Sequence, residues 1–359
     1  MRRIAIINQK GGVGKTTMAV NVGTALARAG HRVLLIDLDP QAHLSLHLGL
    51  DPDDRRPGMY AMLTGSATIA KVRRRVAGNL WVVGASIDLA GAEVELVSVV
   101  GREVILRDLL DQHLGMGKNG RGPRYDYVLM DCPPSLGVLT LNALCAAQEV
   151  FIPLQPHYLA LQGLGKLLET ISLVSKRINP SLRVSGVAVC IHDSGTKLAA
   201  EVIDDVRSFF EAARNTALPW ASTRVLDTVI RRNIKLAESP SFGQSIFDYA
   251  PHSNGAKDYE RLARELHDPE AVGPDQPRAA APPCESPNRP PEAKPSQTEF
   301  AASPAETAVT GTAGTPPRVR RSIGFSPPLR FCPLNHPRGA GGVSSPIADP
   351  SPPSRPGPF

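Results

Sequence analysis

The fold of this chain is decided by residues 8–17, Asn8-Gln9-Lys10-Gly11-Gly12-Val13-Gly14-Lys15-Thr16-Thr17. A glycine-rich turn before a helix directs unpaired N–H groups and the positive end of the helix dipole toward an anion. Lys15 can then neutralise phosphate charge and Thr16 can hold Mg²⁺. The general pattern G-x-x-x-x-G-K-[ST] requires glycine at position 9, where this chain has Gln9. The stretch predicts a phosphate loop of a variant type, with a lysine toward each end.

The segments around this loop predict an α/β fold. Residues 3–8 form an apolar run, residues 17–29 have helical spacing, and residues 33–36 are again apolar and lead to Asp37. This order predicts a βαβ unit, for which a parallel sheet and a right-handed crossover are expected. Further strands are expected at 80–84, 125–130, 149–153, 184–191 and 225–230, and helices at 137–147, 160–178, 196–214 and 256–266. One or two small helices are expected in a loop-rich segment between Pro40 and Arg75, and a helical pattern broken near Gly101 covers 89–114.

Composition divides the chain into two parts. Residues 269–359 contain 22 of the 34 prolines and show little apolar periodicity. We therefore predict one α/β domain over residues 1–267, a mostly parallel sheet with helices on both faces, and a Pro-rich disordered tail over residues 268–359.

Charge and cysteine content limit the cellular setting. The formal net charge is +6, and residues 1–267 contribute most of it, with 31 Lys and Arg against 26 Asp and Glu. This excess suits DNA binding and ordinary surface charge equally well. The five cysteines form no C-x-x-C pair, which indicates a reducing compartment. No signal-peptide pattern or long apolar run is present, so we expect a cytoplasmic protein.

Three aspartates follow predicted strands at the edge of the sheet where ligands bind. Asp131 follows the apolar run 127–130 and is placed to hold Mg²⁺, directly or through its water. Asp37 and Asp39 are two residues apart, so both project to one side of an extended segment. Asp39 is a candidate Mg²⁺ ligand and the best candidate to orient the water that attacks a γ-phosphate. Taken alone, a strand-end aspartate such as Asp131 is more often a turn or cap residue, and the alternative for Asp37 and Asp39 is a Pro-containing turn with solvated acids.

Three motifs together resemble the nucleotide motifs of the ParA/Soj partitioning ATPases, members of the ParA/MinD superfamily with a deviant Walker A loop. These are Lys-Gly-Gly-Val-Gly-Lys-Thr-Thr at 10–17, Asp-Leu-Asp-Pro-Gln at 37–41 and Asp-Cys-Pro-Pro-Ser at 131–135. Residues 153–155 and 232–243 are similar to later family segments. The resemblance spans nearly all of 1–267 and none of the tail.

The resemblance implies an ATPase that uses ATP and Mg²⁺ and forms a dimer with ATP sandwiched between the subunits. Lys10 is then a switch residue that reaches the partner's phosphates. The remaining implied roles are phosphate binding by Lys15, Mg²⁺ binding by Thr16, hydrolysis by Asp39, Walker B function by Asp131, and nucleotide binding by residues 10–17 and Asn233. Without the family pattern, Lys10 is as readily a solvated flank of the loop.

The resemblance also implies that the dimer binds duplex DNA without sequence preference and that a ParB-like partner stimulates hydrolysis. The basic residues expected to meet DNA phosphates are Arg231, Arg232 and Lys235. Lys197 is a further candidate, in a segment that departs from the Asp-x-Arg-Thr pattern of relatives. The alternative for the 231–235 cluster is a solvated polar loop.

The leading hypothesis is therefore an ATPase that drives chromosome or plasmid partitioning and associates with the nucleoid. One alternative is a MinD-like membrane-associated ATPase, which needs a basic amphipathic C-terminal helix. The prolines beyond Leu266 disfavour such a helix, so we expect no stable membrane association. A scaffold that positions another cargo and uses nucleotide only for assembly is a further alternative.

Overall fold

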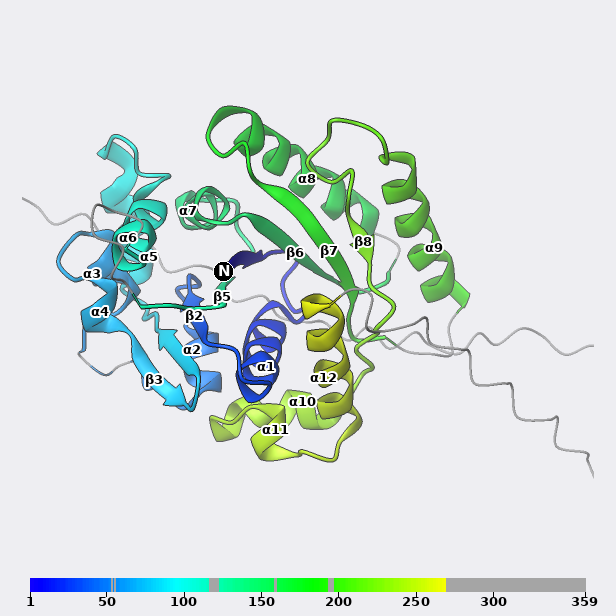
Figure 1. The fold of residues 1–359 in the computed structure, drawn as a ribbon, viewed down its shortest axis with the longest axis horizontal. Coiled ribbons are helices and arrows are strands. Elements are labelled where there is room, and N and C mark those ends of the chain that lie inside the picture. Colours follow the sequence, from blue (N-terminus) through cyan, green and yellow to red (C-terminus); the bar gives the residue numbers. More distant parts are fainter. Residues whose placement is uncertain (53, 55, 116–122, 158–159, 193–196, 269–359) are drawn as a thin grey trace, which may run out of the picture. The chain divides into compact units, whose positions relative to one another are not determined.

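The computed structural model describes residues 1–268 apart from 53, 55, 116–122, 158–159 and 193–196. An eight-stranded sheet has the order β3-β4-β2-β5-β1-β6-β7-β8 (Figure 1). All neighbouring strands are parallel except the edge pair β3 and β4. The strands are β1 (Arg2–Ile6), β2 (Val33–Asp37), β3 (Arg74–Ala77), β4 (Leu80–Val83), β5 (Tyr127–Asp131), β6 (Glu149–Leu154), β7 (Arg183–Val189) and β8 (Arg224–Val225).

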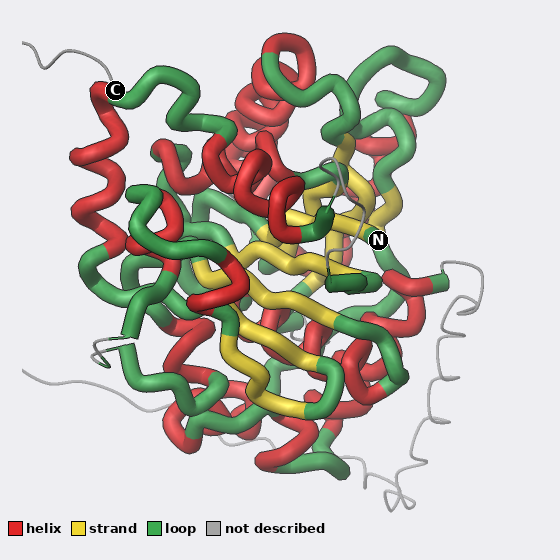
Figure 2. The backbone as a smooth tube through the Cα atoms, turned by 60° about the vertical axis from the view of Figure 1, so that its left-hand side comes forward, coloured by secondary structure: helices red, strands yellow, loops and turns green. Residues whose placement is uncertain are grey.

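Helices cover both faces of this sheet (Figure 2). One face carries α1 (Lys15–Arg28), α2 (His43–His47), α10 (Ile234–Glu238), α11 (Ile246–Tyr249) and α12 (Asn254–His267). The other face carries α3 (Met59–Leu63), α4 (Ile69–Val72), α5 (Leu89–Glu95), α6 (Ile105–His113), α7 (Val138–Ala146), α8 (Ala160–Arg177) and α9 (Lys197–Ala212). Two short 3-10 helices are η1 (Leu96–Ser98) and η2 (Ser239–Phe242). The predicted fold class is confirmed.

The central strands are apolar throughout because both of their sides are buried. In β1, Ile4 and Ile6 pack toward α1, whereas Ala5 packs into the core on the opposite face. Since successive side chains of a strand point to opposite faces, a strand covered on both sides needs an unbroken apolar run. That explains why the central strands could be recognised from the sequence.

The strand predicted at 225–230 is wrong in extent, since β8 covers only Arg224–Val225. The backbone N–H groups of Asp227 and Thr228 donate to the carboxylate of Glu265, at 2.8 and 2.9 Å. Glu265 lies in α12, so a side chain from a distant helix takes the place of a neighbouring strand. A buried N–H needs a partner, but that partner need not belong to a sheet.

Two other segments at the sheet edges could not be described in detail from the sequence. Between Pro40 and Arg75, where one or two small helices were predicted, the structure has three, α2, α3 and α4, and the edge strand β3 begins at Arg74. Residues 210–225 have no role that the sequence could assign. In that segment the carbonyl of Pro219 accepts a hydrogen bond from Val184 N at 2.8 Å, which fastens the segment to β7. The predicted tail at 268–359 lies outside the described residues, apart from Asp268.

Candidate nucleotide and Mg²⁺ site

The conformation of the loop after β1 is set by hydrogen bonds of the Asn8 side chain and by glycines. Asn8 Nδ2 donates to the carbonyl of Pro153 at 2.7 Å, and Asn8 Oδ1 accepts from Lys10 N at 3.0 Å. Gly12 and Gly14 have φ values of 73° and 90°, which disfavour other L-residues. A Cβ at either glycine would meet nothing within 4 Å. The loop therefore borders free space, with the start of α1 facing it, as phosphate binding requires.

The side chain of Lys15 lies at the bottom of this loop. It is buried, and its Nζ donates to the carbonyl of Lys10 at 3.1 Å. Burial lowers the pKa of Lys15, while the charges of Asp131 and Asp39 oppose that shift. A phosphate at the loop would favour the charged form of Lys15, because an anion would replace the lost hydration.

Asp131 ends β5 with a fully buried carboxylate, and neither oxygen has a hydrogen-bond partner of normal geometry. Burial, followed by the charge of Asp37, raises its pKa well above the ordinary value, and the hydroxyl of Thr16 and the charge of Lys15 oppose this. Buried polar groups without partners are rare in proteins, and they often face a position that an ion or a water molecule occupies. The donor set of Asp131 and Thr16 is one that Mg²⁺ accepts.

Asp37 lies beside Asp131 in the sheet register but is satisfied differently. Its carboxylate accepts hydrogen bonds from Ser45 N, Ser45 Oγ and Asp39 N at 3.0, 2.8 and 3.2 Å. Burial raises the pKa of Asp37 to about 7 in spite of these bonds. We infer that Asp37 shapes the turn into α2, whereas Asp131 is directed to a ligand.

Asp39 is the acidic residue that borders the pocket beside the loop. Its Oδ1 accepts from Gln41 N at 3.0 Å, which fixes the turn, and its side chain lines the pocket with Thr16 and Lys15. In the described part of the chain, no three His, Cys, Asp or Glu side chains gather to hold a metal by themselves. That suits Mg²⁺, which keeps waters and substrate phosphates among its ligands.

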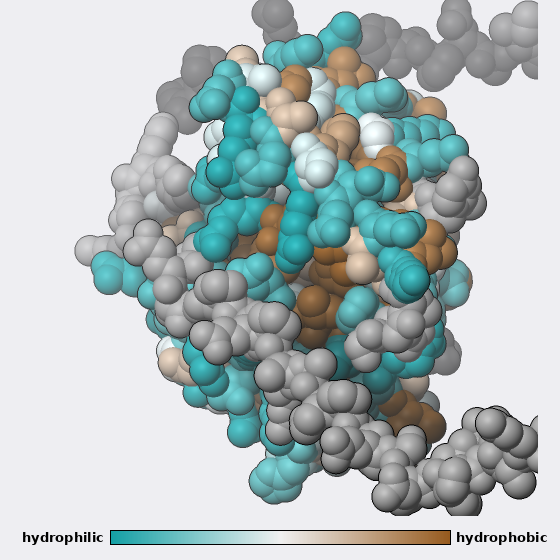
Figure 3. Space-filling view, turned by 90° about the vertical axis from the view of Figure 1, so that its right-hand side faces the viewer, coloured by the Kyte–Doolittle hydropathy of each residue, from teal (hydrophilic) through white to brown (hydrophobic). Residues whose placement is uncertain are grey.

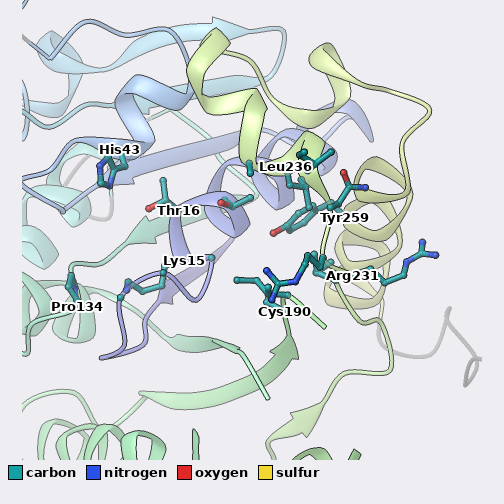
Figure 4. Close-up of a pocket in the computed structure, with 18 of the residues that line it drawn as sticks. Lys15, Thr16, His43, Pro134, Cys190, Arg231, Leu236 and Tyr259 are labelled. Atoms are coloured by element: carbon teal, nitrogen blue, oxygen red, sulfur yellow. The ribbon is translucent and has the colours of Figure 1, made fainter. Parts of the chain in front are cut away.

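A pocket of about 940 Å³ opens from the phosphate loop. In Figure 4, Lys15 and Thr16 lie on one side of it and Leu236, Arg231 and Tyr259 on the other. Figure 3 shows a hollow with a hydrophobic floor on the side of the molecule that carries α9 and α12. The volume suits a nucleotide-sized ligand.

The far end of the pocket is apolar. It is lined by Cys190, Ile191, Ile230, Leu236 and Tyr259, which come from the end of β7, the segment after β8, α10 and α12. An apolar wall opposite a phosphate loop is suited to a purine base. No sequence pattern marks these residues, because they are far apart in the chain and look like ordinary core positions. Asn233, predicted to bind nucleotide, lines the same end and caps α10 by accepting from Lys235 N at 2.8 Å.

Of the residues predicted to bind the nucleotide, those that line the pocket are Gly11, Gly12, Gly14, Lys15, Thr16, Thr17, Asp39 and Asn233. Val13 and Asp131 are buried and do not line the pocket. Lys10 is exposed and outside the lining, and its Nζ contacts His157 Nε2. The positive charge of Lys10 adds to desolvation in lowering the pKa of His157.

The four predicted DNA-binding residues are all exposed. Arg231 forms an ion pair with Asp258, with Nε 3.0 Å from Oδ2, and lines the pocket. Lys235 is paired with Glu238 at 2.9 Å. Arg232 is exposed at the pocket rim, and Lys197 is exposed at the first residue of α9.

A parallel sheet with a glycine-rich loop before α1, a buried lysine and a strand-end aspartate defines a P-loop nucleotide hydrolase with a deviant Walker A motif. Among the described residues, no helix is long and apolar enough to span a bilayer.

Comparisons with known proteins agree with this class. Residues 1–184 match the family described as an AAA domain. The chromosome-partitioning ATPase Soj of Treponema pallidum is 44% identical over 266 residues, which cover 74% of this chain and 96% of that protein. The chromosome partitioning protein ParA of Caulobacter vibrioides is 44% identical over 268 residues, covering 74% of this chain and 94% of that one.

Solved structures show the same fold with nucleotide bound. Cobyrinic acid a,c-diamide synthase of Mycobacterium smegmatis, with an ATP analogue and magnesium, is 37% identical with a TM-score of 0.61, covering 75% of this chain and 97% of that one. The septum site-determining protein MinD of Pyrococcus horikoshii, complexed with Mg-ADP, has a TM-score of 0.56 at 23% identity and covers 75% and 97%.

This chain belongs to the ParA/Soj family of ATPases. The predictions of an ATPase and of ATP and Mg²⁺ as its cofactors are confirmed. The roles of individual residues remain predictions.

Proposed function

We propose that this ATPase drives partitioning of a chromosome or plasmid by an ATP-dependent cycle of dimerisation and DNA binding. ATP assembles a dimer that binds duplex DNA without sequence preference on the nucleoid, and a ParB-like partner stimulates hydrolysis and release. The names of the Treponema and Caulobacter relatives support the partitioning role, at 44% identity over nearly their whole length.

The chemistry falls to residues already placed around the loop. N–H groups of residues 11–17 and the ammonium of Lys15 hold the phosphates, and Asp39 orients the attacking water. Thr16, Asp131 and Asp39 would hold Mg²⁺. When bound, this ion neutralises charge on the terminal phosphates. Hydrolysis depends on positioning of the attacking water and on stabilisation of the phosphate charge. A partner protein that changes either one can therefore control the rate of hydrolysis.

The observation that carries the dimer proposal is the position of Lys10. Its backbone is fixed by Asn8, yet its exposed ammonium contacts His157 and does not line the pocket of its own subunit. Lys15 already occupies the bottom of that pocket. A second lysine that is fixed at its backbone but directed outward suits contact with phosphates held by another subunit.

The basic residues predicted to meet DNA are all exposed, which supports contacts with DNA phosphates: Arg231, Arg232, Lys235 and Lys197. Arg231 and Lys235 have acidic partners, so their pairs with Asp258 and Glu238 would have to be exchanged for DNA phosphates. Affinity that comes from such contacts falls steeply with salt concentration.

The central test compares Lys10→Ala with Lys15→Ala. Nucleotide binding is measured by fluorescence titration, and ATP-dependent dimerisation by sedimentation. We expect Lys15→Ala to abolish binding, and Lys10→Ala to retain most of it but lose the dimer or its hydrolysis. If both variants behave alike, the intersubunit role of Lys10 is refuted. If the wild type shows no ATP-dependent, salt-sensitive binding to arbitrary duplex DNA, the proposed cycle is refuted as a whole.

Asp39→Ala distinguishes this cycle from the scaffold alternative. In a timed switch, loss of water positioning should stop phosphate release and lengthen the life of the dimer. A scaffold that uses nucleotide only for assembly should keep its dimer lifetime unchanged. The MinD-like alternative depends on a C-terminal helix in residues 269–359, outside the described part of the chain, and flotation with liposomes in the presence of ATP tests it.

A further inference from the structure

Exposed apolar side chains occur along residues 87–100, the segment that contains α5 and η1, away from the pocket lining. The inward side chains of this segment, Leu89, Ala92 and Leu96, are buried in the core. The outward ones are between 42% and 100% exposed, and we call them the α5 patch: Ile87, Val94, Val97, Val99 and Val100. They make up five of the fourteen exposed large hydrophobic side chains found in the described residues. Such a concentration marks an interaction site more often than scattered exposure does.

The charges around the α5 patch are opposite in sign to those of the domain. Residues 86–103 contain four acidic residues, Asp88, Glu93, Glu95 and Glu103, and one basic residue, Arg102, which gives a net charge of −3. Residues 1–267 have 31 basic and 26 acidic residues, a net charge of +5. Arg102 is itself engaged, since its Nε donates to Glu103 at 3.1 Å and its Nη1 to the carbonyl of Val97.

These charges decide among the possible occupants. DNA is a polyanion and would be repelled by this surface. A second copy that met the patch with its own patch across a two-fold axis would bring two acidic clusters together. A segment with apolar residues on one side and lysine or arginine on the other fits both features, as in helix-in-groove recognition.

The α5 patch is connected to the nucleotide site through Glu93. Glu93 Oε1 would lie 2.4 Å from a Cβ at Gly137, so its carboxylate packs directly on the Gly137 backbone. Gly137 precedes α7 and ends the segment that begins at Asp131, and Pro134 in that segment lines the pocket. A cation that drew Glu93 away would remove a contact from the segment between Asp131 and α7.

We propose that the α5 patch is the docking surface for a basic amphipathic segment of the protein that stimulates hydrolysis, an inference that rests on the proposed function. The segment buries the exposed valines, pairs its cations with Glu93 and Glu95, and acts on the site through Gly137. Glu95, on the same helix, accepts from the hydroxyl of Tyr60 in α3 at 2.7 Å, so docking also reaches α3.

The test uses the full-length protein and a labelled synthetic helical peptide with leucines on one face and lysines on the other. Its dissociation constant is measured by fluorescence anisotropy for the wild type, for V94S/E95K, and for the matched variant L173S/E169K. The control changes an exposed leucine and an exposed glutamate on α8. We expect at least ten-fold weaker binding for V94S/E95K, little change for L173S/E169K, and unchanged basal phosphate release for both.

Three results would overturn the docking inference. Equal loss of affinity in both variants would show that the peptide responds only to overall charge. Equal binding by all three proteins would place the peptide elsewhere. Loss of the ATP-dependent dimer in V94S/E95K alone, seen by sedimentation, would make a second copy of the chain the occupant. Failure of the proposed function is a separate result, because it shows in the wild type as absence of ATP-dependent DNA binding without peptide.

Discussion

Replacing Asp131 with asparagine should stabilise the nucleotide-free protein while weakening its response to Mg²⁺ and ATP. The wild-type carboxylate is fully buried without a hydrogen-bond partner of normal geometry and lies beside the buried Asp37. Asparagine has nearly the same shape but carries no charge. The substitution therefore relieves a cost in the nucleotide-free protein and removes a ligand from the nucleotide-bound one.

The size of the stabilisation follows from proton linkage. A carboxyl group with an ordinary pKa of about 3.9 costs about 4 kcal/mol to keep protonated at pH 7, which is the upper limit of the relief. Burial of an unsatisfied amide takes back about 1 to 3 kcal/mol. The net gain is then about 1 to 3 kcal/mol, and each kcal/mol raises Tm by about 2 to 4 °C in a domain of this size.

The direction of the pH dependence follows from the sign of the shift. The folded pKa of Asp131 is raised, so wild-type stability falls as pH rises above the unfolded pKa. The advantage of the Asp131→Asn variant should therefore grow with pH. At pH 5 its upper limit is only about 1.5 kcal/mol.

Thermal unfolding with and without Mg²⁺ and ATP measures both effects. At a ligand concentration 100 times Kd, the wild type should gain about 2.7 kcal/mol, and a variant with ten-fold weaker affinity about 1.4 kcal/mol. Asp37→Asn is the matched control, because Asp37 accepts three hydrogen bonds from Ser45 and Asp39. We expect it to be about 1 to 3 kcal/mol less stable than Asp131→Asn and to keep its response to nucleotide. The reasoning is refuted if Asp131→Asn destabilises the nucleotide-free protein, or if it keeps the full increment with Mg²⁺ and ATP.

Three further predictions follow from the described residues. Burial lowers the pKa of His47 to about 4, so the contribution of His47 to stability is lost as pH falls from about 6.5 toward 4. The difference in unfolding free energy between wild type and His47→Gln, measured by urea unfolding, should therefore shrink by about 2 kcal/mol between pH 7.5 and 5. A constant difference would contradict this prediction. A Cβ at Gly186 would lie 2.7 Å from Leu226 Cδ1 and 2.8 Å from Phe151 Cε2. Gly186→Ala should therefore lower the unfolding free energy by about 1 to 3 kcal/mol in the same assay. An unchanged midpoint would show that the neighbouring side chains move to accommodate the methyl group. Arg232→Ala should reduce the slope of log affinity for duplex DNA against log salt by about 1, and an unchanged slope would remove Arg232 from the DNA surface.

The sequence alone was sufficient to predict the phosphate loop, the central strands and the strand-end aspartates. These features are local, since a glycine pattern, a short apolar run and an acid at its end are all read within a few residues. Parallel strands bring their carboxyl ends to one edge, so the approach of Asp39 and Asp131 to the loop followed from strand order alone.

Only the tertiary structure decided features that depend on partners distant in the chain. Glu265 shortens the strand at 225–230, Tyr259 closes the apolar end of the pocket, and Asp258 pairs with Arg231; all three come from α12. The difference between Asp37 and Asp131 is of the same kind, because both look alike as strand-end acids. The packing of α2 supplies hydrogen bonds to the Asp37 carboxylate, whereas the Asp131 carboxylate has no hydrogen-bond partner of normal geometry.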